Sequence, residues 1–353
     1  MAQSAVNGVA LIGAGIYPKE AYLPALHKTK ATLVAIYSRS LKSASECLAE
    51  ARKFDGLCAE NIAAYHDGSP SNGGLDQLLQ RDDVTSVIVA LPTTVQPAVV
   101  LKCLAAGKHV LMEKPIAKDV KDAVALIAEY ESQFQSQKLI LAVAEQFRFD
   151  LAHEKARQIV SDGTIGELVA AHARIWSNMQ PGNKWYETEW RKVPDYQGGF
   201  LLDGGVHFIA LLRYVSSDEI EETASFARQT YDHLPPLDTV QGALRFKSGA
   251  LGTISMSWAS VKGEYSYNFI GTKGSLTITG ADGGTKLVVE DEQGKVVSEE
   301  IIAGEGTAQE FLGFFEAIKR GQGDERASPR QALADVAVVE SLLNGGGKVQ
   351  LYK

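Results

Sequence analysis

Short apolar segments alternate with helical patterns through the first 150 residues, and this alternation constrains the fold more than any other feature. The segments lie at residues 9–12, 33–37, 87–91, 110–112 and 139–145, and helices are expected between them at 18–28, 40–54, 95–107 and 119–133. Nearly continuous apolar strands are typical of a parallel sheet that helices cover on both faces. Residues 1–150 are therefore expected to form an α/β domain around a doubly wound sheet.

The pattern changes near residue 150. A helix is expected over 151–163 and a strand over 168–176, followed by alternating segments with turn glycines at 243–260, 265–280 and 286–301, which predict hairpins. Helices return at 308–321 and 329–346. We expect residues 151–353 to form an α+β domain with a large open, mainly antiparallel sheet, and its C-terminal helix, at 328–345, can pack back on the first domain.

Composition limits the partners. A chain of 353 residues is longer than one compact core usually holds, which favours two domains. Its composition, with 45% hydrophobic and 22% charged residues, is ordinary for a folded protein. A formal charge of −8 without a basic tract argues against nucleic acid, so a small molecule is the expected partner. Apolar runs are too short to span a membrane, and the N-terminus lacks a basic region typical of a signal peptide.

Three cysteines, Cys47, Cys58 and Cys103, lie far apart and form no C-x-x-C pair. Reduced thiols in a cytoplasmic protein explain this spacing better than disulfides, and no Cys/His cluster has the spacing of a metal site.

Gly13-Ala14-Gly15 follows the first expected strand and opens the first expected helix. Glycines at this place let the backbone turn sharply and approach a pyrophosphate, which the helix N-terminus attracts. A lone G-x-G is often only a turn, but its position in the first strand–helix unit favours a dinucleotide site in a Rossmann domain. Pro18 replaces the third glycine of the usual fingerprint, which leaves the packing of strand on helix open.

The second strand ends in Ser38-Arg39-Ser40, where an NAD enzyme commonly carries a carboxylate for the ribose 2′-hydroxyl. Ser38 can donate to a 2′-phosphate, Arg39 can pair with it, and Lys42 adds positive charge. NADP(H) is therefore the preferred cofactor and NAD(H) the alternative. The other interpretation is that Arg39 is only a solvated loop residue.

Glu113-Lys114-Pro115 follows the strand that begins near residue 110. Ligands of a doubly wound sheet lie off the carboxyl ends of its strands, so Lys114 is expected at the cofactor crevice. Its ammonium group can bind a substrate oxygen and stabilise a developing alkoxide. Pro115 favours an extended Lys114 and raises the chance of a cis bond.

Asp203 and His207 are four residues apart, among glycines and before an apolar stretch. If a helix begins near Asp203, the two side chains share one face near its first turn. Histidine titrates near neutrality and can move a hydroxyl proton, so the pair favours a substrate site. The alternatives are that Asp203 only caps the helix and that His207 is a hydrogen-bonded core residue.

Four motifs occur in one order along the chain: the Gly-Ala-Gly turn, Glu113-Lys114-Pro115, the segment 144–148 (AEQFR), and Asp203-Gly-Gly-Val-His207. With the two-domain layout, they resemble the glucose-fructose oxidoreductase / inositol dehydrogenase family, often called Gfo/Idh/MocA. The segments LLDGGVHFIALL and AEQFRF are most similar to a fungal-type, NADP-dependent branch. Tyr22 and Gln96 stand where histidine is common in such proteins.

The resemblance implies that Lys114 is the catalytic lysine, His207 the proton donor or acceptor and Asp203 a residue that orients the substrate. It also implies that Glu145 and Arg148 border the nicotinamide, and that the open sheet forms a homodimer or homotetramer interface. The complete set of expected cofactor contacts is Gly13, Gly15, Ile16, Tyr17, Ser38, Arg39, Ser40, Lys42, Leu91, Pro92, Thr93, Gln96, Glu113, Lys114, Glu145 and Arg148.

Aromatic and cationic side chains gather between the lysine and histidine motifs. Trp176, Trp185, Trp190 and Arg191 are candidates for one wall of a substrate pocket, or they pack a loop onto the sheet.

The motifs together favour a nicotinamide-dependent oxidoreductase that transfers hydride to or from a carbonyl or hydroxyl carbon. By resemblance, the substrate would be a sugar, a cyclitol or a related small molecule. Two alternatives stay open: a reductase of an imine or conjugated double bond, and a sensor or scaffold that binds NADP(H) without turnover.

Overall fold

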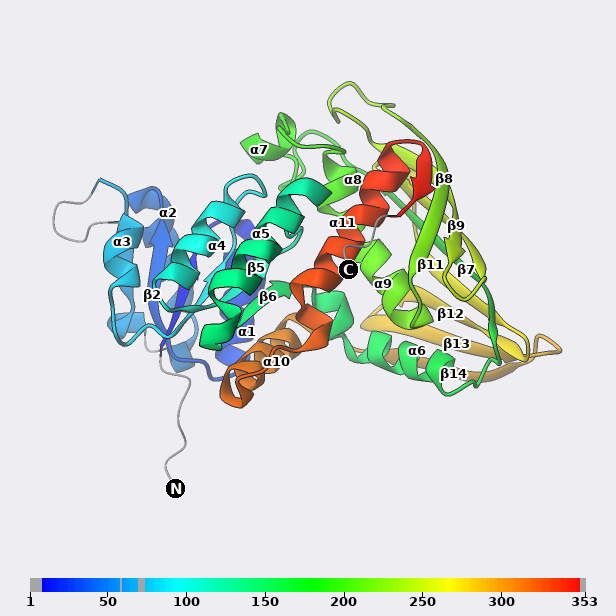
Figure 1. Ribbon diagram of the computed structural model, residues 1–353, viewed down its shortest axis with the longest axis horizontal. Coiled ribbons are helices and arrows are strands. Elements are labelled where there is room, and N and C mark those ends of the chain that lie inside the picture. Colours follow the sequence, from blue (N-terminus) through cyan, green and yellow to red (C-terminus); the bar gives the residue numbers. More distant parts are fainter. Residues whose placement is uncertain (1–7, 58, 69–73, 350–353) are drawn as a thin grey trace. The chain divides into compact units, whose positions relative to one another are not determined.

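The computed structural model describes residues 8–57, 59–68 and 74–349, which form two compact units (Figure 1). The first unit contains the residues up to Ala117, together with Asp122–Gln146 and Thr307–Gln331. The second contains Lys118–Lys121, Phe147–Gly306 and the residues from Ala332 onward. The predicted division at residue 150 differs from this one mainly because 307–331 belong to the first unit. Helix α11 (Pro329–Leu343) begins in the first unit and continues in the second.

The first unit is built on a six-stranded sheet in the order β3-β2-β1-β4-β5-β6. Every pairing in it is parallel, so the carboxyl ends of all its strands lie along one edge. The chain order reverses between β1 and β4, which is the topological switch point where Rossmann folds bind ligands. The strands are β1 (Val9–Ile12), β2 (Leu33–Ser38), β3 (Ala63–His66), β4 (Ser86–Val89), β5 (His109–Glu113) and β6 (Leu141–Ala144).

Helices connect these strands, and β1, β4 and β6 are buried throughout, as expected for strands covered on both faces. The helices and turns are η1 (Pro18–Tyr22), α1 (Leu23–Lys28), α2 (Leu41–Ala51), η2 (Asp55–Leu57), η3 (Ala59–Asn61), α3 (Gly74–Leu79), α4 (Gln96–Ala105), α5 (Val120–Gln133), η4 (Gln135–Gln137), η5 (Gln146–Arg148), α10 (Gly306–Arg320) and η6 (Glu325–Ala327). Most of them lie in the first unit.

A nine-stranded sheet dominates the second unit, in the order β14-β13-β12-β11-β7-β10-β9-β8-β15. Only the pairing of β7 with β10 is parallel among the strands described, so the sheet is mainly antiparallel, as predicted. Its strands are β7 (Leu168–Asn178), β8 (Ile220–Arg228), β9 (Thr239–Phe246), β10 (Leu251–Ser257), β11 (Ala259–Gly271), β12 (Gly274–Ala281), β13 (Gly284–Asp291), β14 (Val296–Ile302) and β15 (Gly346–Lys348).

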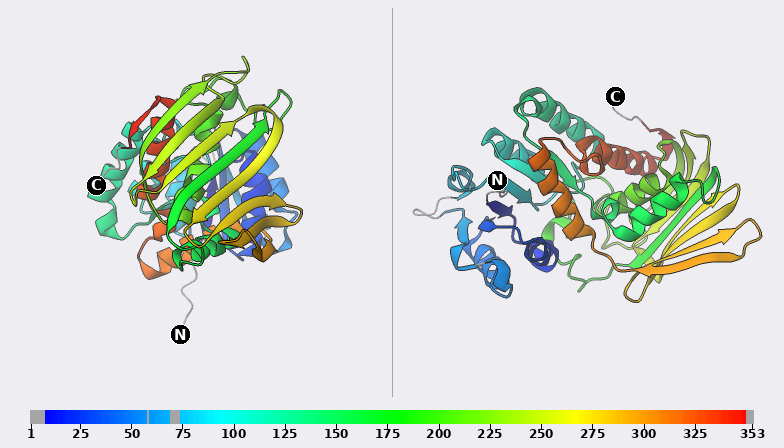
Figure 2. Two further views of the ribbon diagram at one scale, coloured as in Figure 1. Left: turned by 90° about the vertical axis from the view of Figure 1, so that its right-hand side faces the viewer. Right: turned by 90° about the horizontal axis from the view of Figure 1, so that it is seen from below.

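Helices cover one face of this sheet and leave the other open (Figure 2). The helices of the second unit are α6 (Leu151–Ser161), α7 (Glu189–Lys192), α8 (Phe200–Asp203), α9 (Gly205–Ser216) and most of α11. On β7, buried Ala171, Ala173 and Ile175 alternate with more exposed neighbours. Gly205 of α9 lies against Met256 of β10, which places α9 on the buried side.

The expected strands and hairpins are confirmed, with boundaries that move by one to a few residues. The helix expected over 18–28 contains a π-helical turn, η1, before α1. Strand β3 was not predicted because its residues are only half-buried and do not form an apolar run. Cys47 and Cys103 are buried free thiols, whereas Cys58 lies outside the described residues. No helix among the described residues is long and apolar enough to cross a membrane.

Candidate active site

The turn after β1 requires glycine at its first position and leaves space at its second. Gly13 has a φ of +111°, and a Cβ there would lie 2.1 Å from the carbonyl oxygen of Ala90. A Cβ on Gly15 would meet nothing within 4 Å, and Gly15 is exposed. The predicted contacts Ile16 and Tyr17 open the helical segment that continues into η1. The turn therefore has the tight bend and the open approach that a pyrophosphate requires.

The end of β2 carries the predicted residues for the cofactor ribose. Ser38 is the last residue of β2, and Arg39 and Lys42 are exposed beyond it. Ser40 caps α2, because its hydroxyl oxygen accepts a hydrogen bond from the Ser43 amide at 3.2 Å. The same edge of the sheet thus presents one hydroxyl and two cationic side chains.

Gln96 joins the ends of β4 and β5. It is buried at the start of α4, where its side-chain amide donates to the carbonyl oxygen of Glu113 and its side-chain oxygen accepts from the amide of Leu91 at 3.4 Å. Pro92 and Thr93 complete this turn, and Thr93 is buried. These contacts tie the end of β4 to the residue that precedes the predicted catalytic lysine.

Lys114 directly follows β5 and is half-buried. Its amide donates to the carboxylate of Glu113 at 3.1 Å, and the Lys114–Pro115 bond is cis. The hydroxyl of Tyr22, which is fully buried, donates to the other carboxylate oxygen of Glu113. Tyr22, noted in the sequence as a departure from histidine, thus holds the residue that precedes the lysine.

Three carboxyl groups of the first unit lie close together at this edge of the sheet. Glu145 follows β6 and is 2% exposed, and Glu310 on α10 is 1% exposed. Burial raises the pKa of Glu310 well above its ordinary value, and the charges of Glu113 and Glu145 raise it further. Burial, with the charge of Glu113, also raises the pKa of Tyr17.

In the second unit, Asp203 is the last residue of α8, and α9 begins at Gly205. The interpretation of Asp203 as a helix cap is wrong, because Gly204 occupies the cap position and no side chain caps α9. Instead, Asp203 accepts a hydrogen bond from Nε of Arg191 at 2.8 Å, and both side chains are largely buried. The carboxylate therefore fixes a cation of α7, which lies between β7 and α8 in the chain.

Aromatic rings surround this ion pair. The Arg191 guanidinium lies 4.0 Å from the centre of the Trp190 ring and 5.5 Å from that of Trp185. The ring of Tyr196 is 5.9 Å from that of Trp190, and its hydroxyl is buried without a hydrogen-bond partner. Burial and the charge of Asp203 raise the pKa of Tyr196. Trp185, Trp190, Arg191 and Asp203, all predicted as substrate residues, are thus brought together.

His207 lies on the first turn of α9 and is half-buried. Its ring stacks on Phe147, with the centroids 4.8 Å apart and the planes 16° apart. Arg148, a predicted cofactor contact, is buried, and its guanidinium donates to both oxygens of Asp335 at 2.8 and 2.7 Å. Asp335 also pairs with Arg213 of α9, so Arg148 is part of a buried ionic network of the second unit.

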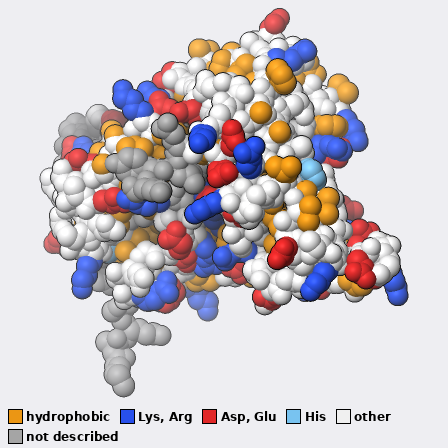
Figure 3. Space-filling view, turned by 45° about the vertical axis from the view of Figure 1, so that its right-hand side comes forward, with side chains coloured by type: hydrophobic (Ala, Val, Ile, Leu, Met, Phe, Trp, Pro, Cys, Tyr) orange, Lys and Arg blue, Asp and Glu red, His pale blue; other side chains and the backbone are white. Residues whose placement is uncertain are grey.

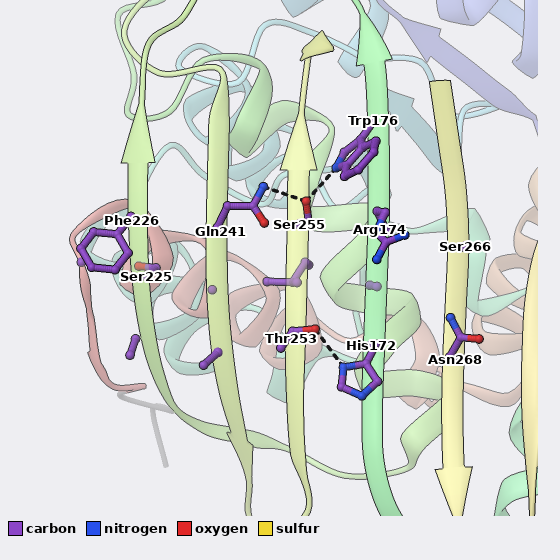
Figure 4. Close-up of a pocket in the computed structure, with 16 residues that line it drawn as sticks. His172, Arg174, Trp176, Ser225, Phe226, Gln241, Thr253, Ser255, Ser266 and Asn268 are labelled. Atoms are coloured by element: carbon purple, nitrogen blue, oxygen red, sulfur yellow. Dashed lines mark hydrogen bonds between the residues drawn. The ribbon is translucent and has the colours of Figure 1, made fainter. Parts of the chain in front are cut away.

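Trp176 is separated from the other predicted substrate residues of the second unit. Its indole N–H donates to Ser255 at 2.7 Å on the open face of the sheet, whereas Asp203 and His207 belong to helices at the covered face. His172 and Arg174 lie on the same open face, with the helices behind the sheet (Figure 4).

Two buried groups near the predicted site were missed from the sequence, Glu310 and the hydroxyl of Tyr196. Glu310 carried a usable signal, because it shares a helical face with Phe314 and Ala317, both of which are buried. A carboxylate on an apolar helix face is a sign of a buried charge. Tyr196 had no comparable signal, since it lies in a loop without periodicity.

Comparison with known proteins matches both parts of the chain to one family. Residues 7–144 match the oxidoreductase family with an NAD-binding Rossmann fold, and residues 153–277 match the GFO/IDH/MocA C-terminal domain. Dehydrogenase FPY6 of Fusarium mangiferae is 35% identical, over 98% of this chain and 99% of that protein. The chain belongs to the GFO/IDH/MocA family of oxidoreductases. The resemblance seen in the motifs is therefore confirmed.

Solved structures of oxidoreductases share the fold. An oxidoreductase from Thermotoga maritima superposes with a TM-score of 0.83 at 29% identity, covering 97% of this chain and 98% of that one. KijD10, a 3-ketoreductase from Actinomadura kijaniata in complex with NADP and TDP-benzene, has a TM-score of 0.77 at 22% identity, over 96% and 97% of the two chains, and shows the fold alone. The predicted fold class is confirmed, and the protein is an enzyme of the dehydrogenase and reductase type.

Proposed function

We propose that the protein is an NADP(H)-dependent oxidoreductase that acts on a carbonyl or hydroxyl carbon of a sugar, a cyclitol or a related small molecule. The observation that carries the proposal is the place of Lys114. It directly follows β5 at the carboxyl edge of a parallel sheet, and Glu113, itself bound by Tyr22, holds the backbone beside it. Nicotinamide supplies or accepts the hydride when the cofactor is bound.

The roles of the side chains follow from their chemistry. The ammonium group of Lys114 would donate a hydrogen bond to the substrate oxygen and stabilise the negative charge that develops there. His207 would give a proton to that oxygen or remove one, because an imidazole ring has nitrogen atoms that can donate or accept a proton. Asp203 would orient the substrate indirectly, by holding Arg191 in position. The rings of Trp185 and Trp190 lie against the guanidinium group of Arg191 and also hold it in place.

The preference for NADP(H) is supported by Arg39 and Lys42, which are exposed just after β2. The segment 38–40 contains no carboxylate that would bind an unphosphorylated ribose, and Ser38 can donate to a phosphate. KijD10, which shares the fold, was solved with NADP. Glu113, Glu145 and Tyr17 would lie on the nicotinamide side, because they gather at the ends of β5 and β6.

A panel of carbonyl, polyol and imine compounds tests the proposal with both cofactors. We expect activity on the carbonyl or polyol compounds, with Lys114→Ala lowering kcat/KM by roughly a thousandfold. The exposed Lys121 offers a matched control, and Lys121→Ala should leave the rate unchanged. Arg39→Ala should weaken NADPH binding far more than NADH binding.

Other outcomes separate the alternatives. Activity confined to imines or conjugated double bonds would support the second type of reductase. Tight NADPH binding without turnover of any compound would instead support a sensor. Equal losses of NADPH and NADH affinity in Arg39→Ala would contradict the 2′-phosphate assignment.

We also infer that two copies associate through the open face of the nine-stranded sheet. Phe226 is 88% exposed and Leu251 is 60% exposed on neighbouring parts of this face. Figure 3 brings the sheet side forward and shows hydrophobic side chains spread among charged ones. Covering this face would remove its exposed apolar side chains from water, which favours self-association.

A further inference from the structure

His207, the residue proposed to move the proton, stacks on the ring of Phe147, with the ring centroids 4.8 Å apart. Phe147 lies in η5, and its carbonyl oxygen accepts a hydrogen bond from Nδ1 of buried His153 at 2.9 Å. The next residue is Arg148, whose guanidinium donates to both carboxylate oxygens of Asp335 at 2.8 and 2.7 Å. The backbone of the stacking residue is therefore held at its own carbonyl group and at the residue that follows.

The same carboxylate also holds the helix that carries His207. Asp335 accepts a hydrogen bond from Nη1 of Arg213, which lies later on α9 than His207. Nε and Nη2 of Arg213 each donate to Glu219 at 2.8 Å. Arg148, Arg213 and Asp335 are 2%, 4% and 3% exposed. Asp335 thus joins the two elements whose rings stack, η5 through Arg148 and α9 through Arg213, and we call these contacts the Asp335 network.

Stability alone does not explain the Asp335 network. The desolvation of buried charges opposes their mutual attraction, and apolar residues of similar volume often stabilise a protein equally well. Charge-assisted hydrogen bonds to both oxygens of a carboxylate are short and directional, so they restrict the orientation of the groups that they join. A side chain that moves a proton needs a fixed orientation, because a displacement of about 1 Å can lower a rate roughly a hundredfold.

We propose that Asp335 and Arg148 are positioning residues for His207. They act through the stacked ring of Phe147 and through α9. This inference rests on the proposed function, in which His207 gives a proton to the substrate oxygen or removes one. That step requires the imidazole to lie about 2.6–3.2 Å from the oxygen, and loss of the network would let the ring tilt out of its stack. The role differs from the cofactor contact predicted for Arg148, and cofactor affinity separates the two.

Arg148→Met tests the proposal, because methionine carries no charge and Asp335 keeps its hydrogen bond from Arg213. The first measurement needs no substrate. It is the NMR signal of the His207 ring in protein labelled with ¹³C-histidine, identified by its absence in His207→Gln. The stacked ring of Phe147 displaces this signal, and Phe147→Leu gives its position without the stack. We expect Arg148→Met to move the signal most of the way to that position.

The second measurement is the effect of D₂O on turnover of the best substrate in the panel. A slower proton step makes kcat more sensitive to D₂O. Arg148→Met should lower kcat roughly tenfold, raise the D₂O effect and leave the Kd of NADPH within about twofold of the parent value. A purely structural role would lower only the fraction of active protein, so the D₂O effect would not change.

Arg330→Met is the matched control. Arg330 is exposed on the same helix as Asp335 and makes a similar pair with Glu131. Its substitution should leave the His207 signal, kcat and the D₂O effect unchanged. If Arg148→Met does not fold, Arg148→Lys gives the same measurements, because lysine keeps the charge but not the planar guanidinium group.

The outcomes distinguish this inference from the function on which it rests. A parent that turns over substrate, together with an unmoved His207 signal in Arg148→Met, would overturn the inference alone. Weaker NADPH binding in Arg148→Met with an unchanged D₂O effect would also overturn it, in favour of a cofactor contact. A parent that turns over no compound of the panel would overturn the proposed function, and with it the role in proton transfer.

Discussion

At the scale of single residues, the two glycines of the turn after β1 have different roles. Gly13 occupies a backbone conformation that side chains avoid, and a Cβ there would clash with the carbonyl of Ala90 at 2.1 Å. Gly15 has free space around it. We expect Gly13→Ala to lower the free energy of unfolding by about 2–4 kcal/mol, because the strand ends must move apart.

Gly15→Ala should leave the unfolding transition almost unchanged, because its new methyl group meets no protein atom. It should still weaken dinucleotide binding, since the methyl group occupies the approach to the phosphates. Chemical denaturation of both variants, with cofactor titration of the second, checks this prediction. Equal destabilisation by the two substitutions would show that the turn does not separate the two roles.

At the scale of elements, α10 brings a carboxyl group into the interior of the first unit. Glu310 and the aromatic residues Phe311 and Phe314 occupy the buried side of this helix. In the unfolded chain Glu310 loses its proton near pH 4.3, whereas its pKa in the folded protein is raised by burial. Above that pH the folded state binds more protons than the unfolded state, so this residue lowers stability as pH rises.

Glu310→Gln should therefore gain stability relative to the parent as pH rises. The two proteins should have similar Tm values near pH 4, where the parent residue is neutral in both states. The difference should then grow from about pH 5 to about pH 8 in favour of the variant. Thermal melts across this range test the prediction. Glu316→Gln is the control, because Glu316 is exposed on the same helix. A constant difference would mean that Glu310 does not retain its proton on folding.

The elements themselves could be predicted where the sequence carries a strong period. Strands β1, β4, β5 and β6 are buried apolar runs, and each was located from the sequence. The break at Gly204 could not be predicted, because the apolar pattern continues from α8 into α9. Strand β3 was missed for the opposite reason, since its half-buried residues show no clear period.

Long-range pairing explains why parts of the site were harder to predict. Lys114 and Asp203 stand beside glycine or proline in short motifs, so their places follow from local sequence. The partners of Glu113 and Arg148 lie far along the chain, at Tyr22 and Asp335. No local pattern encodes such pairs. The alternation of β7 also decides the place of Trp176, because Trp176 lies three positions after buried Ala173 and so faces the opposite side of the sheet, and a shift of one residue would reverse this.

At the scale of the whole molecule, the open sheet face sets the expected state of association. The formal charge of −8 opposes close approach of two copies at low salt, so the contact must come from local side chains. Phe226 projects almost fully exposed from β8. The parent is expected to sediment as a dimer or tetramer, and Phe226→Asp should shift it toward a smaller species, because a buried charge without a partner is costly.

Sedimentation velocity over a range of concentrations measures this shift. Val193 is 78% exposed in the second unit but lies in the loop after α7, outside the sheet. Val193→Asp therefore adds the same charge away from the proposed interface and should leave the sedimentation coefficient unchanged. If both variants keep the assembly of the parent, the open face is not the interface. If the parent itself is a monomer, the open face is covered by no second copy and the inferred self-association fails.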